Sequence, residues 1–522
     1  MAAPEALPRR TVLTLVALGL GVLVIANDFT ALNVALPAIE QDFDVDVGTV
    51  QWVINGYVLV FGMGLITGGR LADMLGRQLI FYIGTAIFAA FSLLGALAPD
   101  ADVLIAARVG MGVGGALMWP AILGMTFAAL PPARAGLAGG LILGVAGLGN
   151  AIGPLLGGVL TDELSWRAIF YVNLPIAAIA VLATASFVHE RKPEAAERRI
   201  DYAGIVTVSL GIISLLLALD QAVDWGWGDP RVIGLFALCV AMLIAFGMIE
   251  RRAGEAALIP PDVLANRSFR AACLTVLMLS AVFFSVVLYV PQLMEKVLGW
   301  SALKAGIGML PMLGLFGAVA FMSGRLYERF GGRPVIIVGT ALMAVGPLLI
   351  SFFDAASGYG VLVPGLALIG IGAGLFIPSV TTAAVTMLDA ARSSLAGGIT
   401  YMFQIAGGAV GLGLVTAIFT SRSENRVVSD SAEFGVRVTG EQASVIHGVL
   451  AGTEPGQRAF ADFGTNLADR ILDVVRDSFV AGIQLSLRVV TAIALVGLVI
   501  AIVGIRPREE APAGAEPEPA AP

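Results

Sequence analysis

The sequence has 522 residues, of which 58% are hydrophobic and only 13% carry a charged side chain. Soluble globular chains carry about 25% charged residues, so this composition excludes water as the main solvent. A formal net charge of -7 gives no reason to expect nucleic acid as a partner. The two cysteines, Cys239 and Cys273, lie in apolar runs, so we expect neither a disulfide framework nor a metal site.

Fourteen apolar runs are long enough to cross a bilayer, which requires about 20 residues in a helix. The first run lacks a small-residue cleavage site, so we expect it to remain as a spanning helix. The predicted spans are 11–38, 49–69, 79–99, 102–130, 137–160, 169–188, 203–220, 231–249, 269–293, 302–323, 334–353, 359–387, 395–420 and 481–505.

The distribution of basic residues predicts the orientation, because cytoplasmic loops are enriched in Lys and Arg. An even number of spans places both termini on one side. With the termini inside, nineteen basic residues fall in inner segments, and the short outer loops carry only Arg167, Arg231, Lys296 and Lys304. We therefore expect a multi-pass protein of the bacterial inner membrane with both termini in the cytoplasm. Indole rings favour the headgroup zone, and the outer helix ends would carry Trp166, Trp225, Trp227 and Trp300.

An internal repeat divides the chain. The sequence GRLADMLGR at 69–77 recurs as GRLYERFGGR at 324–333, each copy after an even-numbered span. Repeated halves that rock about a midplane site suggest a transporter with alternating access. We predict a six-helix bundle at 1–200, an inserted pair of spans at 201–250, and a second six-helix bundle at 251–505. A long outer segment at 421–480 is expected to carry helical hairpin structure, and the tail at 506–522 is too polar to pack and is expected to be disordered.

The repeated loops suit a contact between helices. Their glycines permit tight turns, and their charged side chains can pair with facing groups or helix ends. The alternative is that these charges only set the topology. We interpret the loops as a conformational latch that contains Gly69, Asp73, Gly76, Arg77, Gly324, Glu328 and Arg333.

Small residues line one face of the fifth span. Gly149, Gly153 and Gly157 are four residues apart, which lets a neighbouring helix approach closely. Pro154 removes a backbone donor and permits a bend, so this span is a candidate hinge or seal. Ordinary small-residue packing is the alternative. The complete pattern is Gly140, Gly149, Gly153, Pro154, Gly157 and Gly158.

Two charged residues lie inside spans of the first half. A carboxylate at the bilayer centre costs about 2.5–3.5 kcal/mol, so Asp28 is a functional candidate. Desolvation favours its neutral form, and we expect it to exchange a proton at working pH. Arg108 in the fourth span requires a partner, for which Asp28 or backbone carbonyls would serve. We predict that Asp28 and Arg108 couple protons to transport; a structural pair or a packing role are the alternatives.

Amide and aromatic side chains inside the spans are candidates to line a binding chamber. Aromatic faces attract desolvated cations by up to about 2 kcal/mol, which suits lipophilic cations. Each such residue also has a simpler interpretation in helix packing. The candidates for substrate binding are Asn33, Tyr57, Trp119, Asn150, Gln292, Tyr401 and Gln404.

These motifs resemble the fourteen-span drug:proton antiporter branch of the major facilitator superfamily, which includes quaternary-ammonium exporters. The resemblance covers nearly the whole chain and implies an all-α major facilitator fold, with two six-helix bundles and two inserted helices. It implies that the fifth-span glycines mark an exporter, that Asp28 is the family's acidic position and that Arg108 serves proton transfer. Phe29, Ala31 and Met111 depart from the family pattern, and Met111 replaces a usual glutamine.

The sequence therefore predicts a proton-coupled antiporter that exports amphipathic, cationic drugs or antibiotics and thereby confers resistance. We expect a monomer without cofactors and no enzyme activity, since no nucleophile, base or metal constellation occurs. The chain has no Walker-type loop, so an ion gradient would supply the energy. Two alternatives stay open, namely an exporter of an endogenous lipid or metabolite, and a non-transporting membrane sensor or envelope scaffold.

Overall fold

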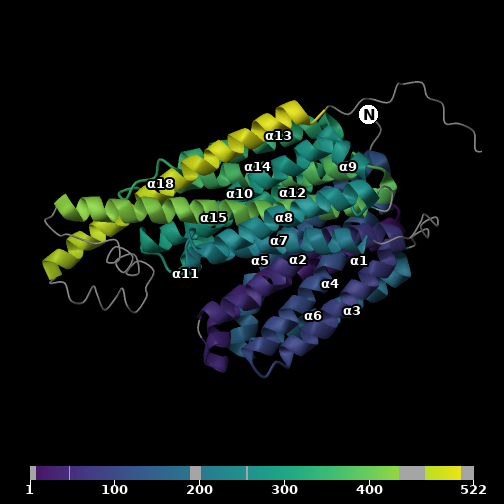
Figure 1. The fold of residues 1–522 in the computed structure, drawn as a ribbon, viewed down its shortest axis with the longest axis horizontal. Helices are drawn as coiled ribbons and strands as arrows, with labels where there is room; N and C mark the ends of the chain where they lie inside the picture. The colour runs from purple at the N-terminus through teal and green to yellow at the C-terminus, as the bar shows by residue number, and fades with distance from the viewer. Residues whose placement is uncertain (1–6, 46, 189–200, 254–256, 434–464, 507–522) are drawn as a thin grey trace, which may run out of the picture.

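The computed structural model describes residues 7–45, 47–188, 201–253, 257–433 and 465–506. Within these ranges the regular secondary structure is helical (Figure 1). The α-helices are α1 (Arg9–Phe43), α2 (Val47–Leu75), α3 (Arg77–Ala96), α4 (Ala101–Ala129), α5 (Ala135–Glu163), α6 (Arg167–Phe187), α7 (Tyr202–Trp225), α8 (Pro230–Ala253), α9 (Pro261–Ala265), α10 (Arg267–Lys296), α11 (Ala302–Gly308), α12 (Leu310–Phe330), α13 (Gly332–Ile350), α14 (Leu362–Thr386), α15 (Ser393–Glu433) and α18 (Thr465–Gly504).

Fourteen of the described helices are long and apolar enough to cross a bilayer, and they correspond one for one to the predicted spans. The predicted number of spans is therefore confirmed. The start of the tenth span is wrong, because residues 302–323 do not form one helix. The short helix α11 ends at Gly308, and the spanning helix α12 begins at Leu310. Pro311 has no backbone N–H to donate and fits only the first turn of a new helix.

Helices α15 and α18 extend beyond the predicted ends of their spans. Helix α15 continues to Glu433 and α18 begins at Thr465, and Figure 1 shows both projecting past the other helices. The predicted ends at residues 420 and 481 came from hydropathy, which marks where a helix leaves the hydrocarbon and not where the helix ends. The middle of the predicted outer hairpin, at 434–464, lies outside the described residues, as does the tail from residue 507.

The spanning helices form two groups that meet along two seams. Helices α1 to α6 pack on one another, and so do α10, α12, α13, α14, α15 and α18. One seam joins α2 to α15, and the other joins α5 to α12. The groups lie close together at the end where α1 begins and α18 finishes, called here the termini end, and diverge towards the opposite end (Figure 1). The predicted boundary near residue 200 lies outside the described residues, and the division into bundles stays a prediction.

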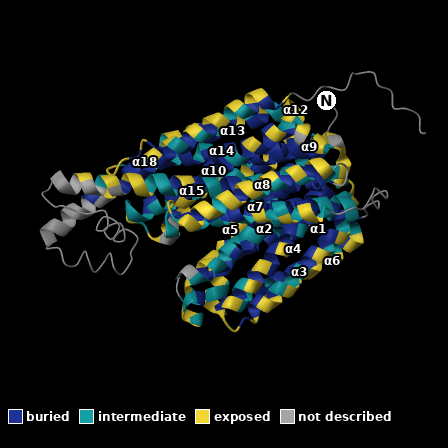
Figure 2. Ribbon diagram, in the orientation of Figure 1, coloured by how far each residue is buried: buried dark blue, intermediate teal, exposed yellow. Residues whose placement is uncertain are grey.

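The inserted pair lies over one of these seams. Helix α7 packs against α2 and α15, and therefore touches both groups, and α8 packs on α7. Figure 2 shows that α8 carries many exposed residues. Large apolar side chains such as Leu155 and Leu182 are about two thirds exposed, at 69% and 67%. Such a surface suits hydrocarbon and not water.

Candidate functional site

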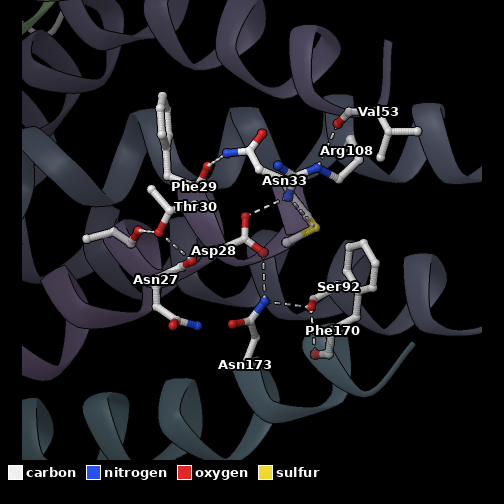
Figure 3. Close-up of polar contacts among 12 residues, drawn as sticks. Asn27, Asp28, Phe29, Thr30, Asn33, Val53, Ser92, Arg108, Phe170 and Asn173 are labelled. Carbon is white, nitrogen blue, oxygen red and sulfur yellow. Dashed lines mark hydrogen bonds and ion pairs between the residues drawn. The ribbon is translucent and has the colours of Figure 1, made fainter. Parts of the chain in front are cut away.

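Asp28 in α1 and Arg108 in α4 form a buried ion pair (Figure 3). Arg108 Nη1 lies 2.6 Å from Asp28 Oδ2, and the two side chains are 1% and 0% exposed. Arg108 Nε also donates a hydrogen bond to the backbone carbonyl of Val53 in α2, at 2.9 Å. Arg108 thus has both kinds of partner that the sequence analysis considered. A buried ion pair requires such additional hydrogen bonds to offset its desolvation.

The sequence analysis missed Asn173, which holds the other side of the carboxylate, and Ser92, which positions Asn173. Asn173 in α6 donates its amide to Asp28 Oδ1 at 2.9 Å and to Ser92 Oγ in α3 at 3.3 Å. Ser92 Oγ in turn donates to the carbonyl of Phe170 at 2.9 Å. Asp28 is therefore bound from α4 and α6 at once (Figure 3). The available signal was a lone asparagine inside the apolar sixth span.

Arg108 has a further partner that does not depend on Asp28. The centre of its guanidinium group lies 4.3 Å from the centroid of the Tyr57 ring. Such a cation–π contact is worth about 2 kcal/mol when it is desolvated. With Val53 and Tyr57 as partners, Arg108 has favourable contacts in both charge states of Asp28. Two of the partners of Arg108 are therefore independent of the Asp28 side chain.

The predicted glycine face of α5 packs on α1 beside Asp28. A Cβ atom at Gly149 would lie 2.8 Å from Cβ of Ala26, and one at Gly153 would overlap Thr30. One at Gly157 would overlap the carbonyl of Ala31. Of the remaining residues in the pattern, Gly140 faces α12, Gly158 lies near Val34, and Pro154 is exposed within a continuous helix. The glycines thus place α5 directly against the segment of α1 that carries Asp28.

The first repeated loop contacts the other helix group at the termini end. Asp73 accepts hydrogen bonds from the backbone N–H groups of Ser394 and Leu395, at 3.2 and 2.8 Å, in the first turn of α15. Arg77 pairs with Asp73 at 3.1 Å and donates to the carbonyl of Ala390 at 2.6 Å. A Cβ atom at Gly69 would lie 2.6 Å from the carbonyl of Ser394. A carboxylate at a helix N-terminus satisfies free N–H groups and the helix dipole.

The second loop repeats this contact across the other seam. Glu328 accepts a hydrogen bond from the backbone N–H of Leu137, at 3.2 Å, in the first turn of α5. Gly324 and Gly136 lie backbone to backbone, since a Cβ atom at either would be 2.5 Å from the carbonyl of the other. Arg333 differs from Arg77, because it donates to Ile502 of its own helix group. Each loop thus places a carboxylate on the N-terminus of a helix in the other group.

The turns of both loops depend on glycine. Gly76 and Gly331 have φ of 108° and 81°, values that L side chains rarely adopt. Each glycine stands directly before the next helix, so the turns from α2 to α3 and from α12 to α13 are tight. The glycines therefore keep Asp73 and Glu328 close to the partner group.

Three of the predicted substrate-binding residues come together at the α2 and α15 seam. The rings of Trp119 and Tyr401 are 4.4 Å apart between centroids. The ring of Phe61 lies between those of Tyr401 and Tyr57, with its centroid 5.8 Å from the first and 5.7 Å from the second. The amides lie outside this row of rings: Asn33 and Asn150 are exposed on α1 and α5, and Gln292 and Gln404 are partly buried on α10 and α15. In the described part of the chain, no group of three or more His, Cys, Asp or Glu residues could hold a metal ion.

Known proteins resemble the chain over most of its length. Residues 18–412 match the family described as Major Facilitator Superfamily. The tetracenomycin C resistance and export protein of Streptomyces glaucescens is 31% identical over 497 residues, which cover 94% of this chain and 90% of that protein. The puromycin resistance protein pur8 of Streptomyces alboniger is 34% identical over 403 residues, which cover 76% of this chain and 80% of that protein.

A third relative and a solved structure agree with these matches. The multidrug transporter protein MdtP of Bacillus subtilis is 31% identical over 404 residues, which cover 77% of this chain and 74% of that protein. The crystal structure of the human organic anion transporter MFSD10 has a TM-score of 0.62 at 14% identity, and covers 95% of this chain and 100% of that chain. At this identity the likeness concerns the fold alone.

Proposed function

The chain belongs to the major facilitator superfamily, and we propose that it exports amphipathic, cationic drugs or antibiotics across the bacterial inner membrane in exchange for protons. The resistance and export functions in the names of its relatives support the export of drugs. The observation that carries proton coupling is the ion pair of Asp28 and Arg108, buried inside a protein that spans the bilayer. An intramembrane ionisable pair is costly to keep and marks an ion pathway.

In this proposal the structure represents the outward-facing half of the cycle. With both termini in the cytoplasm, the contacts of Asp73 and Glu328 close the inner side. Opening inwards requires that both contacts break, since each joins one helix group to the other. The two loops then act as the latch that the sequence predicted, and the groups rock about the aromatic row between them.

Proton binding at Asp28 would supply the coupling. Protonation removes the charge that Arg108 Nη1 faces at 2.6 Å, so the two states of Asp28 differ in how strongly α1 is held to α4. One charge that moves down about 100 mV releases roughly 2.3 kcal/mol. This free energy supports an almost fiftyfold drug gradient per proton, because 1.4 kcal/mol corresponds to a factor of ten.

Everted membrane vesicles test this function. With the lumen acidified, vesicles that contain the chain should accumulate ethidium, and an uncoupler should release it. Asp28→Asn should abolish accumulation, while Asp229→Asn, which removes a partly exposed carboxylate paired with Arg231 far from Asp28 in sequence, should leave it unchanged. Gradient-driven accumulation in the Asp28→Asn vesicles at the rate of the unaltered chain would contradict the proposal.

A second candidate function is the export of a metabolite that the host cell makes. The S. glaucescens relative, whose name joins resistance to export, matches almost the full chain and favours this alternative. Deletion of the gene would then leave tolerance of foreign drugs unchanged and cause a metabolite to accumulate in the cells. A loss of drug tolerance without a retained compound would argue against it.

A further inference from the structure

A cavity of about 470 Å³ lies at the termini end of the helix group that contains α10 and α18. Its walls come from the segments where α10 and α13 begin and where α12, α14 and α18 end. The end of α18 packs beside α13 there (Figure 1). Ligand pockets in proteins have volumes of about 300–1,000 Å³, so a small ligand or the headgroup of a lipid fits this cavity.

The charge of this cavity is positive. Of the described residues that line it, the two with charged side chains are Arg333 and Arg506. Arg333 Nη2 donates a hydrogen bond to the backbone carbonyl of Ile502 at 2.9 Å, and Arg333 Nε is buried without a hydrogen-bond partner. A carbonyl carries no net charge, and a buried N–H group without an acceptor is costly. An anion in the cavity would accept this N–H and balance the charge.

An extra glycine in the second repeated loop directs Arg333 to this cavity. Counted from the first glycine of each loop, Arg77 corresponds to Gly332, and Arg333 follows one residue later. One residue along a helix of 3.6 residues per turn rotates a side chain by about 100°. A Cβ atom at Gly332 would lie 2.5 Å from the ring of Tyr327, so this position has no room for a side chain. Arg77 therefore pairs with Asp73 of its own loop, whereas Arg333 reaches α18.

The helix surfaces next to Arg333 are apolar and exposed. Val338 on α13 is 50% exposed, and Val503 on α18, the neighbour of Ile502, is 63% exposed. Figure 2 shows exposed residues along both helices. Such surfaces on spanning helices suit hydrocarbon chains. A ligand with an anionic head and apolar tails therefore matches both parts of this region, and an inorganic anion matches only the arginines.

We propose that this cavity binds the phosphate group of an anionic phospholipid, that Arg333 recognises it and that Arg506 is a second cationic contact. A guanidinium group presents several N–H donors in a fixed fork that matches phosphate oxygens. Basic pockets between membrane-spanning helices bind lipid headgroups of this kind. The acyl chains would lie along α13 and α18. This inference goes beyond the proposed function, because it concerns a lipid that stays bound and not the exported compound.

The test measures lipid binding to the purified full chain in detergent by native mass spectrometry. The probes are dioleoylphosphatidylglycerol, which is anionic, and dioleoylphosphatidylcholine, which has the same acyl chains and no net charge. Arg333→Gln should weaken binding of the anionic lipid by about tenfold or more and leave that of the neutral lipid unchanged, because hydrogen bonds to charged groups are the strong ones. Arg506→Gln should weaken binding of the anionic lipid less, since Arg506 is exposed.

The matched control is Arg329→Gln. Arg329 is an exposed arginine of the same loop, its guanidinium group lies over the ring of Phe330, and it does not line the cavity. Its removal should leave the affinity for the anionic lipid unchanged. An equal loss in Arg329→Gln and Arg333→Gln would show general attraction to a basic surface and would overturn the proposed site.

Two further arms keep the proposal falsifiable. Thr386→Trp fills the cavity from an exposed position on α14 without removing a charge, and should also weaken binding of the anionic lipid by about tenfold if Arg333→Gln fails to fold. Glycerophosphoglycerol, the same headgroup without acyl chains, should bind far more weakly than the lipid. Equal affinity for this headgroup would overturn the assignment to a lipid. Equal binding of the two lipids, or unaltered affinity in a folded Arg333→Gln or Thr386→Trp protein, would overturn the site itself.

Discussion

Asp73 Oδ2 lies 2.8 Å from the backbone nitrogen of Leu395, which is 322 positions further along the chain. The contact places a carboxylate of α2 on the first turn of α15, so a side chain of one helix group caps a helix of the other. Because this hydrogen bond joins the two helix groups, it stabilises the conformation in which they are in contact. It does not stabilise either group by itself.

Asp73→Asn should therefore shift the conformational equilibrium away from the closed termini end. A charge at a helix end is worth about 0.3–1 kcal/mol and up to about 2 kcal/mol when partly buried. Loss of 1–2 kcal/mol changes the ratio of the two states about 5- to 30-fold. Spin labels at Ala133 and Ala265, exposed residues at the termini end of the two groups, would report the change by pulsed electron paramagnetic resonance. An unchanged distance distribution would refute a latch at this contact.

The natural cysteines favour this measurement. Cys239 and Cys273 are both buried, so introduced cysteines are the accessible ones. Asp229→Asn in the same labelled background serves as the control, because it removes a carboxylate without touching a seam.

Gly157→Ala should destabilise the protein, because a Cβ atom there would overlap the carbonyl of Ala31. Overpacking of this kind costs about 1–3 kcal/mol. Gly234→Ala in α8 is the matched control, since nothing lies within 4 Å of its Cβ position and alanine is the better helix former by about 1 kcal/mol. Thermal unfolding in detergent should show a lower Tm for the first variant and an equal or higher Tm for the second. Equal Tm values for the two variants would show that α5 does not pack closely on α1.

Asp28→Asn should lower the unfolding free energy as well as stop transport. Arg108 would keep a buried positive charge without its carboxylate, and breaking a buried pair costs about 3–5 kcal/mol. The double variant Asp28→Asn with Arg108→Gln removes both charges and should recover much of the lost Tm, but no proton-driven accumulation of ethidium. Recovery of transport together with stability would mean that the pair is structural only.

Asn173→Ala should cost about 1–3 kcal/mol, because it leaves Asp28 Oδ1 without its donor. The effect should depend on the charge of Asp28. In a double-mutant cycle measured by unfolding, the loss should therefore be smaller when Asp28 is already asparagine. Strictly additive losses would show that the hydrogen bond to Asp28 contributes nothing.

Hydropathy and loop motifs allowed much of this architecture to be predicted from the sequence. A run of apolar residues is a local property, and the bilayer imposes the same length on every run, so the fourteen spans could be found one at a time. The break between α11 and α12 was not predicted, because Met309 and Pro311 are apolar enough to continue a hydrophobic run. Hydropathy does not register a missing N–H group.

The partners of the charged residues were harder to predict. Asp28 and Arg108 stand out in their own spans, but which helix faces them depends on packing that no single run encodes. Asn173 looks in the sequence like other amides inside apolar spans, and only the approach of α6 to α1 gives it a role. Asp220 was not predicted to lie within a helix, for another reason. It stands at the predicted end of its span, where a charged residue is expected to mark the boundary. In the structure α7 continues to Trp225, which leaves Asp220 within the helix.

Helix α15 links events at the two faces of the membrane. Its 41 residues correspond to about 60 Å at 1.5 Å each, roughly twice the hydrocarbon thickness of about 30 Å. This one helix contains the backbone amide of Leu395 near its beginning and residues such as Gly408, which line a cavity, further along. Its other end projects past the neighbouring helices (Figure 1). A tilt of α15 moves its projecting end further than its middle. An antibody fragment that binds this projecting end should therefore detect, or prevent, a movement of α15 that begins at Leu395 on the other side of the bilayer.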